Sequence, residues 1–118
     1  MESVAQKSAI KGGEFIVRET EAQEIFIPEE FSEEQKMMAA ATQDFIDKEI
    51  TPNIDRIDGM EEGLMPSLME KAGELGLLGI SVPEAYGGMG MNFNTGMLMA
   101  DIVAASGSFS TAYGAHTG

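Results

Sequence analysis

Apolar residues recur every three or four positions in four stretches of the chain, which is the spacing of an amphipathic helix. The first stretch follows Ser32, a favourable N-cap, and begins with two glutamates that suit the positive end of a helix dipole. Pro52 is expected to end this helix, because the residue before a proline avoids helical backbone angles. The pattern predicts a helix over 33–51, with an apolar side made of Met37, Met38, Ala41, Phe45, Ile46 and Ile50.

The second predicted helix is shorter and begins near Met65 and Pro66, since proline is tolerated in the first turn of a helix. It runs to Leu75, and Gly76 is expected to end it in a left-handed conformation. The acidic stretch 53–63 before it is expected to be a solvated connection, because its carboxylates lack the spacing of a calcium-binding EF-hand loop.

The segment 75–118 is almost free of charge, with Glu84 and Asp101 as its only charged residues. It contains the third predicted helix, which is capped by Asn92 or Asn94 and is apolar on most sides. A water-exposed helix normally carries more charge, so we expect this helix to be buried on more than one side. We also expect the segment to be covered by a structure that these residues do not include.

A fourth helix is predicted to start near Ser108 or Ser110 and to run to Gly118 without a terminator, as if the chain were cut inside a helix. The fold class that results is all-α. Residues 1–25 read as a partly ordered polar extension, with a brief strand at Glu14–Val17 as the alternative, and residues 26–118 read as one helical domain.

Charge and composition exclude several classes of partner. A net charge of −13 with seven basic residues argues against binding to nucleic acid and to anionic membrane surfaces. No run approaches the roughly 18 apolar residues of a membrane span, and the start of the chain does not resemble a secretory signal. The absence of cysteine from the sequence suits a protein of the cytoplasm.

Candidate catalytic residues are scarce in this sequence. His116 is the only histidine, which leaves neither a histidine-based metal cluster nor a Ser/His/Asp triad. The glycines of Gly87–Gly90 lack the Lys-Ser/Thr pair of a P-loop and the spacing of a dinucleotide fingerprint, so they indicate close backbone approach and positive φ angles. We therefore predict no catalytic, cofactor-binding or metal-binding residue.

The stretch 75–90, with five glycines, a proline and a tyrosine at fixed offsets, resembles the amino-terminal domain signature of the flavin-dependent acyl-CoA dehydrogenases. The resemblance implies an enzyme of three parts, of which this chain holds the amino-terminal helices and lacks a middle β-domain and a carboxyl-terminal helical bundle. It also implies FAD as the cofactor, acyl-CoA as the substrate, trans-2-enoyl-CoA as the product, and electron-transfer flavoprotein as a partner. A homodimer or homotetramer is implied for the full-length enzyme, and this chain alone is expected to be inactive.

Relatives of the same fold leave alternatives open, namely an acyl-CoA oxidase or a flavin monooxygenase. A freestanding acidic helical interaction module is a further alternative.

The resemblance also implies a substrate-binding role for part of the fourth helix, which borders the cavity for the acyl tail in this family. The residues concerned are Ser110, Thr111, Gly114 and Gly118, which are expected to share one face. Their small size is similar to that of the very-long-chain branch, so the resemblance implies a long-chain substrate.

Overall fold

A computed structural model describes residues 9–117, which divide into two compact units, 9–32 and 33–117. Every regular element within residues 9–117 is helical, so the all-α prediction is confirmed for the described part of the chain. None of the helices in that part is both long and apolar enough to cross a bilayer. The units meet in sequence at Ser32, whereas the domain boundary expected at residue 26 stays a prediction.

The first helix of the second unit, α1 (Glu33–Phe45), continues into a π-helical turn, η4 (Ile46–Ile50). This matches the helix expected over 33–51, but Pro52 does not end the helical path. It lies in the first turn of a 3-10 helix, η5 (Thr51–Asn53), where its missing N–H is not needed. The π turn leaves Ile46 and Ile50 both fully buried.

A short helix, α2 (Ile54–Asp58), occupies the first half of the acidic stretch that was expected to be a solvated connection. That expectation is wrong for these residues because Ile57 is 5% exposed and belongs to the hydrophobic core. Arg56 pairs with Glu61 across the turn that follows. Within this stretch, α2 is therefore a helix with an apolar inner side and a charged outer side.

The next helix, α3 (Leu64–Glu74), confirms the second predicted helix to within one residue at each end. Gly76 follows it with φ 81°, so the predicted left-handed terminator is also confirmed. Two 3-10 turns then lead to the last two helices: η6 (Leu77–Gly79) and η7 (Glu84–Tyr86).

Asn92 caps α4 (Phe93–Val103), and its Oδ1 accepts hydrogen bonds from the backbone N–H and the hydroxyl of Thr95, at 3.0 and 2.9 Å. The Thr95 hydroxyl in turn accepts a 2.8 Å hydrogen bond from the amide Nε2 of Gln35 in α1. These bonds link α1 to the start of α4, and Thr95 at their centre is completely buried. Asn92, rather than Asn94, is thus the cap.

Burial along α4 is uneven. Only one face of α4 is buried within the described residues, and its buried side chains are Thr95, Met99 and Val103, which repeat every four residues. Phe93 and Met97 are 79 and 53% exposed. No described element covers the other side of α4, so its expected burial on more than one side by a part outside these residues stays a prediction. The related expectation of uncovered apolar surface in the charge-poor segment is confirmed.

The last helix, α5 (Gly107–Thr117), starts one residue before the earlier of the two predicted positions. Ser106 is the reason, since its Oγ accepts a hydrogen bond from the backbone N–H of Phe109 at 3.2 Å, as an N-cap does.

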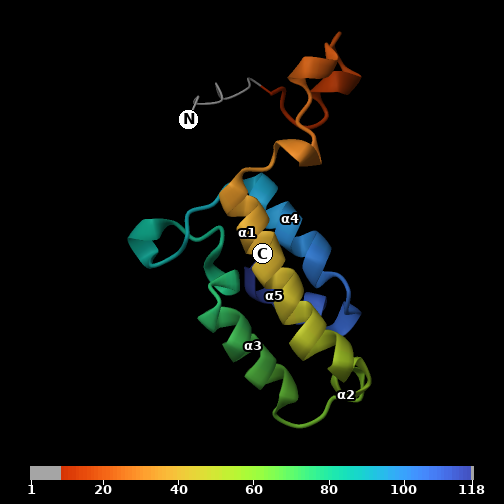
Figure 1. The fold of residues 1–118 in the computed structure, drawn as a ribbon, viewed down its shortest axis with the longest axis vertical. Coiled ribbons are helices and arrows are strands. Elements are labelled where there is room, and N and C mark those ends of the chain that lie inside the picture. The colour runs from red at the N-terminus through yellow and green to blue at the C-terminus, as the bar shows by residue number, and fades with distance from the viewer. Residues whose placement is uncertain (1–8, 118) are drawn as a thin grey trace. The chain divides into compact units, whose positions relative to one another are not determined.

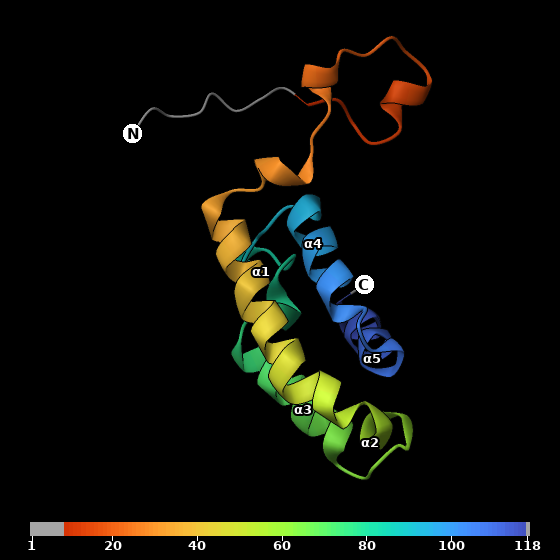
Figure 2. The same ribbon diagram turned by 45° about the vertical axis from the view of Figure 1, so that its right-hand side comes forward.

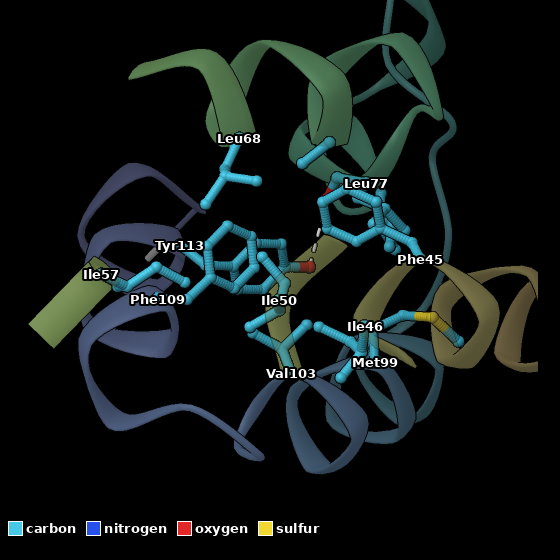
Figure 3. Close-up of a cluster of buried hydrophobic side chains, with 12 residues drawn as sticks. Phe45, Ile46, Ile50, Ile57, Leu68, Leu77, Met99, Val103, Phe109 and Tyr113 are labelled. Carbon is cyan, nitrogen blue, oxygen red and sulfur yellow. Dashed lines mark hydrogen bonds between the residues drawn. The ribbon is translucent and has the colours of Figure 1, made fainter. Parts of the chain in front are cut away.

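In the second unit, α1 and α4 lie side by side, and α3 runs in the opposite direction to α1, beside its continuation η4, where Lys71 pairs with Glu49 (Figure 1 and Figure 2). The core lies where these helices meet α5, and Figure 3 shows its side chains converging from all of them. Phe109 is completely buried, with its ring centroid 5.9 Å from that of Phe45 and 6.4 Å from that of Tyr113. The core consists of Phe45, Ile46, Ile50, Ile57, Leu68, Ala72, Leu77, Ile80, Met99, Val103, Phe109 and Tyr113.

The first unit holds three 3-10 turns: η1 (Glu14–Ile16), η2 (Ala22–Glu24) and η3 (Pro28–Glu30). The alternative of a brief strand at Glu14–Val17 is wrong, because Gly13 with φ 82° turns the chain directly into η1.

Candidate functional site

The candidate site is a mostly apolar groove of about 420 Å³ in the second unit. One wall is α4, the other is α5, and the turn that follows α3 forms the floor. Tyr113 is the only titratable side chain among the described residues that line it, which are Leu77, Ile80, Ser81, Asn92, Phe93, Gly96, Met97, Ala100, Val103, Ser110, Tyr113, Gly114 and Thr117.

The structure brings part of the predicted site together. Ser110 and Gly114 line the groove, whereas Thr111 does not. A helix advances about 100° per residue, so Thr111 points a quarter-turn away from Ser110, and its hydroxyl donates instead to the carbonyl of Gly107 at 2.8 Å. Gly118 lies outside the described residues. The role of all four in substrate binding stays a prediction.

Two residues of α5 in the groove wall, Tyr113 and Thr117, were missed by the sequence reasoning. The wall contributed by α4 was missed too, although its groove-lining residues at 93, 96, 97 and 100 repeat at helical spacing. That spacing, in a helix with almost no charge, was the available signal. It was interpreted only as a buried surface.

Glycines in both walls hold the groove open. A Cβ added at Gly96 or at Gly114 would meet no atom within 4 Å, so larger side chains at these positions would extend into free space. The size of the residue at these two positions therefore sets how much room the groove offers.

Tyr113 joins the wall to the floor. Its hydroxyl donates a 3.2 Å hydrogen bond to the carbonyl of Leu77 (Figure 3), and its side chain is 7% exposed. Burial raises the pKa of Tyr113 above its ordinary value of 10.0, because the phenolate would lose solvation. The phenol is therefore neutral at physiological pH and acts as a structural donor.

The glycine-rich turn beyond the floor brings two backbone segments into contact. The N–H groups of Met89 and Met91 donate to the carbonyls of Gly79 and Ile80, each at 2.8 Å. A Cβ on Gly88 would overlap the carbonyl of Val82, so only glycine fits there. With Gly87 at φ 85° and Gly90 at φ 59°, the prediction of close backbone approach and positive φ is confirmed.

Chemically, this groove is suited to binding. Its described lining contains no carboxylate, lysine, arginine or histidine, so it offers no general acid or base of the usual kind. Apolar walls that carry a few hydroxyl and amide groups suit a largely apolar ligand.

Comparison with known proteins identifies the family. Residues 32–118 match the family model described as acyl-CoA dehydrogenase, N-terminal domain. The chain belongs to this family. The resemblance inferred from the stretch 75–90 is therefore confirmed.

Similar acyl-CoA dehydrogenases include a probable acyl-CoA dehydrogenase of Bacillus subtilis, 42% identical over 108 residues, which are 92% of this chain and 18% of that protein. The mitochondrial isovaleryl-CoA dehydrogenase of Solanum tuberosum is 36% identical over 91 residues, 74% of this chain and 22% of that protein. A crystal structure of an acyl-CoA dehydrogenase complexed with FAD, from Bacillus anthracis, aligns with a TM-score of 0.84 at 43% identity, over 93% of this chain and 19% of that one. The chain spans about a fifth of the length of these relatives.

Proposed function

We propose that this chain is the amino-terminal domain of an FAD-dependent acyl-CoA dehydrogenase that converts long-chain acyl-CoA to trans-2-enoyl-CoA. The supporting observation is the apolar groove, opened by Gly96 and Gly114, in a domain of the acyl-CoA dehydrogenase family. In the proposed reaction the α-carbon loses a proton to a carboxylate base and the β-carbon loses a hydride, which FAD accepts when bound.

The part that this chain plays is to bind the acyl tail between α4 and α5. Each methylene taken out of water contributes roughly 0.8 kcal/mol, so the depth of the groove translates directly into chain-length preference. The small residues Ser110, Gly114, Gly96 and Ala100 favour a long tail, because none of them fills the space between the walls.

The described residues do not fit FAD itself. A pyrophosphate needs cationic side chains or a set of backbone donors, and no lysine or arginine follows Lys71 in the sequence. We infer that FAD and the carboxylate base are held by other parts of the polypeptide. By family resemblance we further propose electron-transfer flavoprotein as the electron acceptor and a homodimer or homotetramer as the assembly, and by composition a location in the cytoplasm.

Substitution of Gly114 by Glu in the full polypeptide that contains these residues tests the proposal. A glutamate side chain occupies about the length of three methylenes, so it should cost a long acyl tail roughly 2.4 kcal/mol, or about fifty-fold in kcat/KM relative to a short one. The measurement is kcat/KM across acyl-CoA substrates of increasing length, with electron-transfer flavoprotein as the acceptor.

The matched control is Ala115→Glu, which adds the same side chain at an exposed neighbour that does not line the groove. Gly114→Leu adds similar volume without charge and should shift the preference in the same direction. An unchanged chain-length profile in both Gly114 variants, or an equal shift in Ala115→Glu, would contradict the assignment of the groove to the acyl tail.

A further inference from the structure

The first unit contains a closed loop, which we call the N-terminal loop (residues 10–24). The backbone N–H of Ile10 donates to the carbonyl of Glu24 at 2.9 Å and so joins the two ends of the loop. Arg18 pairs with Glu14 at 3.2 Å and with Glu24 at 3.1 Å, which ties the middle of the loop to both sides. The backbone of the loop is thus defined by polar contacts.

Apolar side chains of the same loop are not buried by other residues of the first unit. None of the described residues 9–32 is buried, and Phe15, Ile16 and Val17 are 58, 75 and 82% exposed. Three consecutive large apolar residues on a short, tied turn have no support from within the unit. Exposed apolar patches of this kind mark interaction surfaces.

The matches to relatives differ in how much of the chain they cover. The match to the B. subtilis protein covers 92% of the chain, which leaves out too few residues for it to miss the loop. The match to the isovaleryl-CoA dehydrogenase of S. tuberosum covers 74% of the chain, which is too little to hold both the loop and the whole of the family match over 32–118. The loop therefore lies outside the part common to the whole family.

The same relatives differ in length. The match to the B. subtilis protein spans 108 residues and is 18% of that protein, whereas the match to the S. tuberosum protein spans 91 residues and is 22%. A longer match that forms a smaller share belongs to a longer protein. The relative that shares the loop therefore exceeds the other by more than the length of this whole chain, and we call this extra length the additional region.

We propose that the N-terminal loop docks Phe15, Ile16 and Val17 onto the additional region of the same polypeptide. The loop is matched in the long relative, which has the additional region, and lies outside the family match over 32–118, as expected if the loop and the additional region accompany each other. An anionic membrane is disfavoured as the partner, because residues 9–32 hold six glutamates against one lysine and one arginine. This proposal rests on the proposed function only in that both assume a longer polypeptide that contains this chain. It does not depend on the substrate.

A photo-crosslinking experiment on the full polypeptide tests the docking. p-Benzoylphenylalanine, close in shape to phenylalanine, replaces Phe15, and copies with ordinary nitrogen are mixed with ¹⁵N-labelled copies before irradiation. Mass spectrometry of the crosslinked peptides should place the crosslink in the additional region of the same copy. The same probe in place of Met60, which is 87% exposed in the second unit, should give no crosslink to that region.

Each other outcome overturns the proposal. A crosslink to a differently labelled copy would make the loop a contact between polypeptides, and no protein crosslink would leave the patch in solvent. A full polypeptide no longer than the S. tuberosum relative would lack the docking surface altogether.

A second measurement keeps the test independent of the probe. The double variant Ile16→Ser, Val17→Ser should raise amide hydrogen exchange in the additional region at least ten-fold, while Met60→Ser leaves it unchanged. The chain-length profile should stay as in the unsubstituted enzyme, which separates this result from failure of the proposed function. Unchanged exchange in the double variant would overturn the docking.

Discussion

Replacement of Tyr113 by Phe removes one hydroxyl group and keeps the ring in the core. The variant lacks the 3.2 Å hydrogen bond from the Tyr113 hydroxyl to the carbonyl of Leu77. Leu77 is only 4% exposed, so water does not readily replace the lost donor. Such a bond contributes about 1 kcal/mol net, because folding exchanges it for a bond to water. A decrease of about 1 kcal/mol in the free energy of local opening should speed amide hydrogen exchange in α5 and η6 about five-fold.

The control for this experiment is Tyr86→Phe, since Tyr86 is 83% exposed and loses a hydroxyl group that already faces water. It should leave exchange unchanged. If Tyr113→Phe has no effect, or if both variants have the same effect, the hydroxyl of Tyr113 does not hold α5 to the floor of the groove.

The pH dependence gives a second test of the same residue. Because burial raises the pKa of Tyr113, the folded protein keeps the phenolic proton at a pH where the unfolded chain releases it. The stability that follows is fully present below the ordinary value of 10.0 and declines as the pH rises above it. The difference in stability between the unsubstituted protein and Tyr113→Phe should therefore shrink above pH 10, and a difference that grows instead would refute this account.

Three further substitutions test the fold that carries the groove. Phe109→Ala should lower the free energy of unfolding by about 3–5 kcal/mol in urea titration, and Phe109→Leu by much less because it keeps most of the volume. Gly88→Ala should cost roughly 1–3 kcal/mol, since its Cβ overlaps a neighbouring carbonyl, whereas Gly79→Ala, whose Cβ would be 3.6 Å from the nearest atom, should be tolerated in the same titration. Asn92→Ala should cost about 1 kcal/mol and speed exchange at the start of α4, while equal effects from Asn94→Ala would contradict the capping assignment.

Local signals in the sequence were sufficient for several elements. Gly76 ends α3 because its φ of 81° is accessible to glycine, and Asn92 starts α4 because its side chain accepts from the third residue of the helix. Both depend on residues within a few positions of one another. Such signals remain valid whatever the rest of the chain does.

Elements that depend on distant contacts were not predictable in the same way. The stretch 53–63 was predicted to be a solvated connection because of its many acidic residues. It nevertheless contains α2, because Ile57 packs into a core built mainly from other helices. Thr111 was grouped with Ser110 and Gly114 because their spacing was expected to put them on one helical face, but Thr111 does not line the groove with the other two. The sequence reasoning assigned no role to Tyr113, because what its hydroxyl does depends on the Leu77 carbonyl, 36 positions earlier.

The linked side chains of Gln35, Thr95 and Asn92 have a consequence for how the groove keeps its dimensions. The hydrophobic effect is non-directional, so apolar burial by itself does not specify one position of a helix along its neighbour. Hydrogen bonds are directional, so a shift of α4 along α1 would break the 2.8 Å bond between Gln35 and Thr95 and disturb the bonds that cap α4. Together with the 3.1 Å contact from the hydroxyl of Thr42 in α1 to the sulfur of Met99 in α4, these bonds fix the position of this groove wall along α1.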